Sequence, residues 1–212
     1  SSLNNMQQAN GFVGATTNYI FGDIAGGDAN KGSTAADQPD IAEIETFGTT
    51  SANSFLLGKW NAVYEGVKRA NNVMDMVEKA GDKITGGDQI IAQAKVIKAY
   101  WMFEGLRVFG ANIPYVDLDS YRADTDPQVG NIDENGNPTY VWTNIEQDLK
   151  DAIAGLPATW GNAQKGRVNS WAAKAMLCRL YQYWASPFNG KNGAGDSSKW
   201  AQAKQLAKDI IY

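Results

Sequence analysis

The chain has 212 residues, of which 43% are hydrophobic and 20% charged, as in ordinary globular proteins. No apolar run reaches the roughly 18 to 20 residues that span a bilayer, and the net charge of −4 argues against nucleic acid as a partner. Histidine is absent, which excludes Ser-His-Asp and Cys-His catalysis and histidine-ligated zinc or haem.

The first segment, residues 1–52, is acidic and rich in Gly, Asn, Ser and Thr, so we expect it to be mostly irregular. Within it, the sequence FGDIAGGDANKG at residues 21–32 is no phosphate loop, because no Gly-Lys-Ser/Thr follows. Its short carboxylate and amide side chains suit either a solvated loop or a site for sugar hydroxyls.

Residues 53–212 carry helical periodicity. From Leu56 to Val77 apolar residues recur at steps of three and four, which predicts a helix with Asn53 or Ser54 as N-cap and Gly81 as C-cap. A second helix is predicted from about Asp88 to Phe109. Gly110 would end it, and Pro114 prevents its continuation.

Residues 111–140 are predicted to be a loop. Asn135-Gly136 within NIDENGNPTY is a strong signal for a tight turn, so we expect a small β-hairpin and no large sheet. Asp133, Asn135 and Asn137 alternate as calcium ligands do, but the twelfth loop position is Trp142 where a Glu is needed. A hairpin turn is therefore favoured over a metal site.

Three further helices are predicted. One starts near Thr143, a possible N-cap, and ends at Pro157. The next runs from about Val168 to Ala185 with apolar residues on nearly all faces, so deep burial is expected, and its Cys178 should behave as a small hydrophobe. The last begins at Asp196 or Ser197. We expect it to be the first member of a third helix pair whose second helix is missing, so that the chain is an incomplete domain.

The aromatic residues divide into two groups. Those on helical stripes are predicted to lie in the core, namely Trp60, Trp101, Trp171, Tyr181 and Trp200. Those in predicted loops could form a platform for an apolar ligand face or fold back onto the core, namely Phe47, Tyr121, Trp160 and Phe188.

A family resemblance rests on four motifs in order. The most specific is AKVIKAYWMFEGLRVFGANIPYV at residues 94–116, in which a basic residue, an aromatic cluster, Leu-Arg, Phe-Gly and then Ile-Pro follow one another. The others are GKWNAVYEGVKRANNVMDMV, NIEQDLKDAIAGLP and GRVNSWAAKAMLCRLYQYWASPFNG. Together they resemble the SusD/RagB family over about residues 58–212, with one extra residue between Phe-Gly and Ile-Pro.

The resemblance implies a mainly α fold of tetratricopeptide-like helix pairs with long loops, of which residues 1–212 would be the N-terminal region. It also implies a surface-exposed lipoprotein of the outer membrane that binds oligosaccharides and delivers them to a SusC-like TonB-dependent transporter. The family's lipid-anchored Cys is not in this chain. Such proteins bind without catalysis, so neither an enzyme nor a cofactor or metal is expected.

No family motif locates sugar contacts on this sequence, because ligand residues of the family lie in variable loops. From composition we select Asp28, Asn30, Phe47 and Trp160 as candidate glycan-binding residues. The alternative function is a tetratricopeptide-like scaffold that binds a protein or peptide along a concave helical surface. A glycosidase would need two carboxylates facing each other, and nothing in the spacing selects such a pair.

Overall fold

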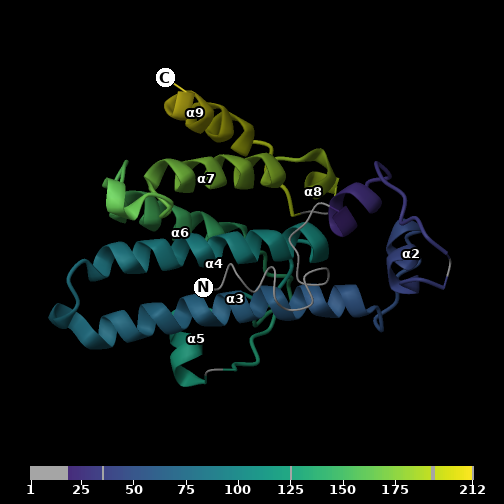
Figure 1. Ribbon diagram of the computed structural model, residues 1–212, viewed down its shortest axis with the longest axis horizontal. Helices are drawn as coiled ribbons and strands as arrows, with labels where there is room; N and C mark the ends of the chain where they lie inside the picture. The colour runs from purple at the N-terminus through teal and green to yellow at the C-terminus, as the bar shows by residue number, and fades with distance from the viewer. Residues whose placement is uncertain (1–18, 35, 125, 192–193, 212) are drawn as a thin grey trace. The chain divides into compact units, whose positions relative to one another are not determined.

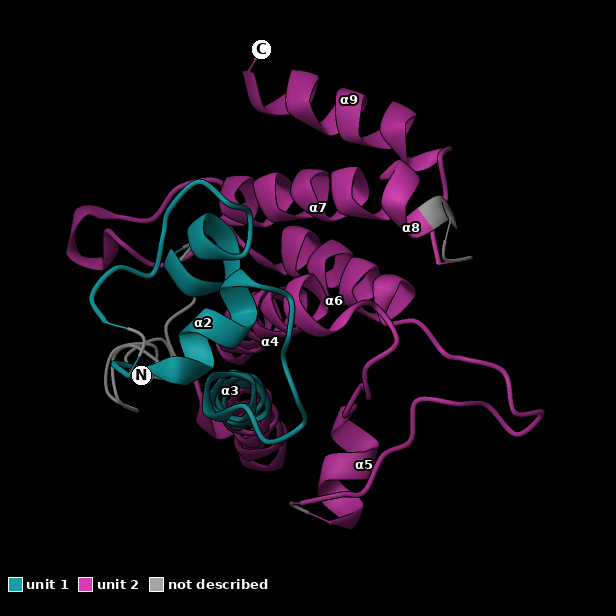
Figure 2. Cartoon of the chain, turned by 90° about the vertical axis from the view of Figure 1, so that its right-hand side faces the viewer, with its two compact units in different colours: residues 1–66 teal, residues 67–212 magenta. Residues whose placement is uncertain are grey.

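The computed structural model describes residues 19–34, 36–124, 126–191 and 194–211. These residues form helices joined by loops, and their β-structure is one isolated antiparallel bridge between Ile132 and Pro138. The predicted mainly α fold is confirmed. The chain divides into two compact units, residues 1–66 and residues 67–212 (Figure 2), and the long helix α3 (Ser54–Ala80) contributes to both.

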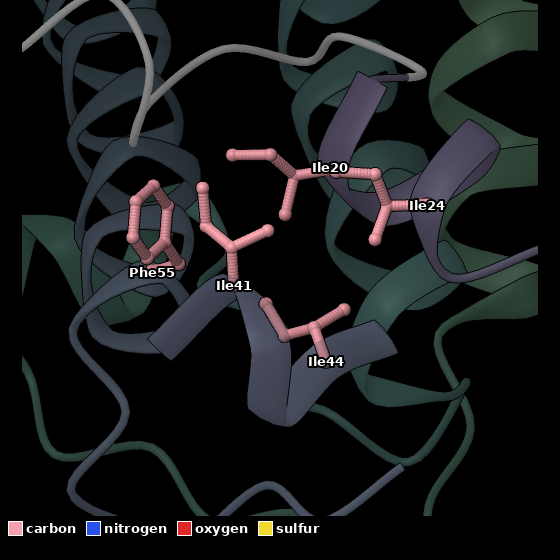
Figure 3. Packing of buried hydrophobic residues seen from close by; sticks show 5 residues of the cluster. All are labelled: Ile20, Ile24, Ile41, Ile44 and Phe55. Atoms are coloured by element: carbon pink, nitrogen blue, oxygen red, sulfur yellow. The ribbon is translucent and has the colours of Figure 1, made fainter. Parts of the chain in front are cut away.

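The first unit contains a π-helix, η2 (Tyr19–Ile24), the short α2 (Pro39–Glu45) and the start of α3. Turns and bends connect them. Both short elements direct isoleucines inward, where they meet a phenylalanine of α3 (Figure 3). This cluster consists of Ile20, Ile24, Ile41, Ile44 and Phe55. The acidic, Gly-rich segment is therefore held by a small apolar core of its own.

Asn53 joins α2 to α3. Its Oδ1 accepts hydrogen bonds from the backbone N–H groups of Phe55 (3.1 Å) and Leu56 (3.2 Å), which identifies Asn53 as the N-cap. Its Nδ2 donates to the Asp40 carbonyl (2.8 Å) and to Glu43 Oε2 (3.0 Å). Ser54 donates from its hydroxyl and its N–H to the Asp40 carboxylate, and these bonds lower the pKa of Asp40.

The second unit is a stack of helices. α4 (Gly87–Phe109) packs on α6 (Trp142–Gly155), α6 on α7 (Ser170–Trp184), and α7 on α9 (Lys199–Ile211), as Figure 1 shows. This is the predicted arrangement of tetratricopeptide-like helix pairs. Shorter elements lie between them, namely η3 (Gly81–Lys83), α5 (Leu118–Ala123), η4 (Asn162–Gln164) and α8 (Pro187–Lys191).

The aromatic cluster of α4 fixes that helix among its neighbours. Trp101 is completely buried and Phe103 nearly so, and the Phe103 ring meets Tyr183 of α7 edge-on with centroids 5.1 Å apart. α4 then stops at Gly110, whose N–H donates to the Leu106 carbonyl (2.9 Å). Gly110 has φ 84° and ψ 172°, a conformation that is essentially restricted to glycine.

The chain that follows Gly110 is held by polar contacts. Asn71 of α3 donates from Nδ2 to the Val116 carbonyl (3.0 Å), and the Val141 N–H donates to the Ala111 carbonyl (3.0 Å). Between these points, Tyr115 donates its hydroxyl to Asp148 Oδ2 of α6 at 2.6 Å. The returning chain is thus tied to both α3 and α6.

Lys98 of α4 is buried beside this contact. Its Nζ lies 4.2 Å from the Tyr115 ring centroid and 4.0 Å from Asp148 Oδ2, and 2% of the residue is exposed. Burial lowers the pKa of Lys98 and raises those of Asp148 and Tyr115. We call Lys98, Tyr115 and Asp148 the buried triad. The triad joins α4, α6 and the intervening chain, because the Lys98 ammonium lies beside both Asp148 and the Tyr115 ring.

The predicted turn at Asn135-Gly136 is present. The Asp133 N–H donates to the Asn137 carbonyl (2.8 Å), Gly136 has φ 80°, and the Ile132–Pro138 bridge closes the turn. The Asp133 carboxylate accepts hydrogen bonds from the backbone N–H groups of Asn135 (2.9 Å) and Asn137 (2.8 Å). It therefore stabilises the turn, and the described residues contain no metal-binding group of three His, Cys, Asp or Glu.

Three local predictions were wrong in the second unit. The loop expected over residues 111–140 contains α5, whose N-cap Asp117 accepts from the Ser120 N–H at 2.7 Å. Tyr121, expected in a loop, is buried on this helix, and its hydroxyl donates to Asn72 Oδ1 (3.2 Å). Thr143 is not a cap, because α6 starts at Trp142 and Val141 is its N-cap without a side-chain hydrogen bond.

The burial predicted for the last two long helices was also wrong in part. α7 is buried where α4, α6 and α9 contact it, and Ala172 and Ala175 are exposed on its open side. Trp171 and Trp200, both expected in the core, are 39% and 48% exposed. Cys178 is buried as expected, and its thiol donates to the Ala203 carbonyl of α9 at 3.3 Å. Burial raises the pKa of this thiol.

Asn53→Ala should lower the free energy of unfolding by about 2 kcal/mol, since it removes the α3 cap and leaves the half-buried partners of the amide without their hydrogen bonds. Chemical denaturation followed by circular dichroism measures this loss. Asn61→Ala, on an exposed position of the same helix, is the control and should leave stability nearly unchanged. Equal effects of the two substitutions would contradict the capping role.

Lys98→Met should destabilise the chain by about 3 kcal/mol, because it leaves Asp148 buried without its cation. Adding Asp148→Asn should recover most of that loss, since the amide keeps an acceptor for Tyr115 and carries no charge. Urea denaturation of the single and double variants measures the coupling. Lys79→Met removes a largely exposed cation from Asp75, which keeps its second partner Arg122, and should cost less than about 1 kcal/mol. Additive effects of the Lys98 and Asp148 substitutions would contradict the buried triad.

Candidate functional site

Phe47 occupies an unusual position at the end of α2. The N–H of Gly48 donates to the Glu43 carbonyl (2.8 Å) and that of Phe47 to the Ile44 carbonyl (3.3 Å), which is the hydrogen-bond pattern of a Schellman motif. The residue after the C-cap of this motif is usually glycine, because it takes positive φ. Here it is Phe47, with φ 56° and 81% of its surface exposed.

Strained backbone is concentrated in this unit. Three non-glycine residues of the described chain have positive φ, namely Ser33 (58°), Gln38 (52°) and Phe47 (56°), and all lie in residues 33–47. Each such residue costs about 1–3 kcal/mol, and such strain is often kept at ligand sites. An exposed ring gains little from burial, so packing gives no reason for a phenylalanine at position 47.

Asn30 links the loop that follows η2 to the end of α2. Its Nδ2 donates to Glu45 Oε1 (2.5 Å), and its Oδ1 accepts from the Gly32 N–H (2.8 Å). Glu45 is the last residue of α2, two positions before Phe47. Lys31 supports the same loop by donating to the carbonyls of Thr34 (2.9 Å) and Asp37 (2.5 Å). The amide of Asn30 is thus occupied, and its contribution is to position this part of the unit.

Asp28 differs from Asn30. Its side chain is exposed and forms no hydrogen bond or ion pair with another residue in the described part of the chain. An exposed carboxylate without a partner can accept hydrogen bonds from ligand hydroxyls. Within the first unit, therefore, the structure offers an exposed ring at Phe47 and a free acceptor at Asp28.

Trp160 belongs to the second unit. It is half-buried, its Nε1 donates to the Val168 carbonyl (2.8 Å), and the Arg167 guanidinium lies 5.7 Å from its ring centroid. The hydrogen bond to Val168 holds the indole in place beside the start of α7, whose N-cap is Asn169. The ring is partly exposed, so it retains a surface that a ligand could contact.

Sequence reasoning missed Trp171, the second residue of α7. Its ring is 39% exposed, and Lys174 Nζ lies 4.2 Å from the ring centroid. The periodicity of the helix assigned Trp171 to the core, because apolar spacing alone does not show which face has a partner. The neighbouring polar residues Asn169 and Lys174 were the available signal of an exposed face.

These residues are suited to binding. Exposed aromatic rings can contact the apolar face of a ligand, and nearby carboxylates, amides or cations can fix its orientation. The one thiol, Cys178, is buried away from solvent. None of the helices in the described ranges is both long enough and apolar enough to cross a membrane.

The sequence matches a family profile over residues 6–182. Its description reads "SusD-like", "Starch-binding associating with outer membrane". The chain belongs to the SusD-like family. Lys98, Tyr115 and the stop at Gly110 lie within the motif at residues 94–116, and Asp148 lies within NIEQDLKDAIAGLP, another of the four motifs. The family signature therefore corresponds here to packing around α4 and not to the exposed candidate residues.

Individual relatives agree with this membership. A SusD-like protein of Bacteroides ovatus is 28% identical over 171 residues, which are 79% of this chain and 29% of the relative. A crystal structure with a xylogluco-oligosaccharide is 25% identical, with a TM-score of 0.71 over 99% of this chain and 39% of that one. Surface glycan-binding protein A from Bacteroides thetaiotaomicron, 19% identical with a TM-score of 0.69 over 99% of this chain and 40% of that one, shares the fold.

The SusD-like chain therefore spans well under half the length of these relatives. The Bacteroides ovatus protein is covered to 29% and the two solved structures to 39% and 40%. The likeness to the two solved structures extends over 99% of this chain. The ligand and the partner of this chain are therefore proposed below and are not taken over from the relatives.

Phe47→Gly should leave the free energy of unfolding unchanged or raise it by up to about 1 kcal/mol, because glycine relieves the positive φ and little buried surface is lost. Thermal and urea denaturation measure the change. Ile44→Ala in the apolar cluster is the contrasting variant and should destabilise by about 2 kcal/mol or more. A clear loss of stability in Phe47→Gly would show that the ring has a structural purpose.

Proposed function

We propose that this SusD-like chain belongs to a surface protein that binds oligosaccharides and passes them to an outer-membrane transporter. The observation that carries the proposal is the likeness, over 99% of the chain, to a structure with a xylogluco-oligosaccharide. Membership of a family described as starch-binding and associated with the outer membrane supports it further. The protein would bind its ligand without altering it.

In this proposal Phe47 supplies the platform. Its exposed ring would lie against the CH-rich face of a sugar, and the Asp28 carboxylate would accept hydrogen bonds from hydroxyls. Asn30 would act through Glu45 by holding the end of α2. Trp160, fixed by its hydrogen bond to Val168, would provide a separate aromatic contact for sugar within the second unit. The strain at Phe47 would then be retained for ligand binding.

The transporter partner and the membrane anchor are proposed by analogy with the family. The proposed partner is a SusC-like TonB-dependent barrel, and the proposed location is the outer membrane, reached through a lipid anchor in a surface-exposed lipoprotein. A lipid anchor holds a protein at a membrane without a spanning helix.

Calorimetric titration of neutral oligosaccharides, including xylogluco- and laminari-oligosaccharides, tests the proposal on this chain. Phe47→Ala should weaken binding about tenfold or more, since stacking on an exposed ring contributes on the order of 1.5 kcal/mol. Asp28→Ala should weaken it less. Leu57→Ala, which removes another exposed apolar side chain of the first unit, is the control and should leave affinity unchanged.

The expected result is saturable binding that depends on Phe47. Binding that Phe47→Ala and Trp160→Ala leave unchanged would remove these residues from the site. Failure of every oligosaccharide to bind, combined with capture of a peptide by the helical stack, would replace the proposal with the scaffold function.

A further inference from the structure

Charge is distributed unevenly in the second unit. Residues 152–195 contain no Asp or Glu, although the chain as a whole carries a net charge of −4. The same stretch contains five cationic residues, Lys165, Arg167, Lys174, Arg179 and Lys191. It begins within α6 and includes all of α7. Residues 152–195 are therefore a basic segment within a chain that is acidic as a whole.

The carboxylates of the adjacent helix do not compensate this charge. On α6, Glu146 is bound to Lys150 and Lys199, Asp148 belongs to the buried triad, and Asp151 pairs with Lys95. Across the described ranges, Lys165, Arg167 and Lys174 form no ion pair, whereas Arg122 binds both Asp75 and Glu78. The basic residues near the start of α7 are thus left for solvent or a ligand.

Two of these cations rest on tryptophan rings. Arg167 lies 5.7 Å from the centroid of Trp160, and Lys174 lies 4.2 Å from that of Trp171. The hydrogen bond from Trp160 to the Val168 carbonyl and the Asn169 cap hold both pairs at the beginning of α7. We call Trp160, Lys165, Arg167, Trp171 and Lys174 the α7 patch.

We infer that the α7 patch binds an acidic glycan, one whose sugar rings carry carboxylates, as in a uronic acid chain. A tryptophan offers a flat surface to the sugar ring, and the neighbouring cation is placed to meet the carboxylate on that ring. Arg167 can bind a carboxylate through two parallel hydrogen bonds. The inference rests on the proposed function and names the ligand class for one part of it.

The combination of groups favours this ligand over other anions. A membrane surface or nucleic acid is bound chiefly by the number of cations, and the net charge of the whole chain opposes such long-range attraction. Two ring–cation pairs suit a polymer that alternates apolar faces with single negative charges. Repeating sugars with one carboxylate each have this character.

The test is calorimetric titration of the folded chain with oligogalacturonate and with the neutral oligosaccharides of the previous experiment. Oligogalacturonate should bind, and raising the salt concentration should weaken it, because exposed charges are screened. The double variant Arg167→Gln/Lys174→Gln keeps both rings and removes two charges. It should bind oligogalacturonate at least tenfold more weakly and neutral sugars unchanged.

Lys204→Gln/Lys208→Gln is the matched control, because it removes two exposed lysines of α9 with the same change in net charge. It should leave oligogalacturonate binding within about twofold of the parent. Circular dichroism and the unfolding midpoint establish that each variant is folded, and Lys174→Gln alone replaces the double variant if the latter is not. Equal weakening by both double variants would overturn the inference in favour of non-specific attraction.

The two proposals fail in distinguishable ways. Binding of neutral sugars without binding of oligogalacturonate would overturn the acidic-glycan inference and leave the proposed function in place. Oligogalacturonate binding that Trp171→Ala and the charge variant leave intact would also overturn it, because the ligand would then lie elsewhere. Absence of binding to every sugar would overturn both.

Discussion

The packing of the second unit depends on one buried ammonium, that of Lys98, whose positive charge has to be compensated inside the protein. A lysine buried between helices is unfavourable unless its charge meets a partner, and here the partners come from two separate segments. The carboxylate of Asp148 belongs to α6, and the ring of Tyr115 belongs to the chain that returns after Gly110. Satisfying Lys98 therefore requires α4 to end where it does and the following chain to come back across it.

Much of the helical fold could be predicted because its boundaries are encoded locally. Asn53, Gly81 and Gly110 act through their own caps or their own backbone conformation, so they identify the ends of α3 and α4 without knowledge of any partner. The start of α6 could not be predicted in this way, because Val141 provides no side-chain cap. α5 was not predicted, because its six residues are too few to show helical periodicity.

The face of a helix that becomes buried is not encoded locally, because it depends on which other helices pack against it. The apolar spacing of α7 is compatible with burial all round, but its neighbours α4, α6 and α9 leave Trp171 partly exposed. The candidate site was predictable to a similar degree. Composition drew attention to Phe47 and Asp28, whereas the strained backbone at Phe47 and the occupied amide of Asn30 are properties of the folded chain.

The single cysteine gives the stack a built-in reporter. The Cys178 thiol is buried on α7 and donates to a carbonyl of α9, so a reagent can reach it only when these two helices separate. Since burial also raises the pKa of the thiol, the closed state contains very little of the nucleophilic thiolate. The rate of thiol labelling would therefore measure how often α9 leaves its place, with no residue added or removed.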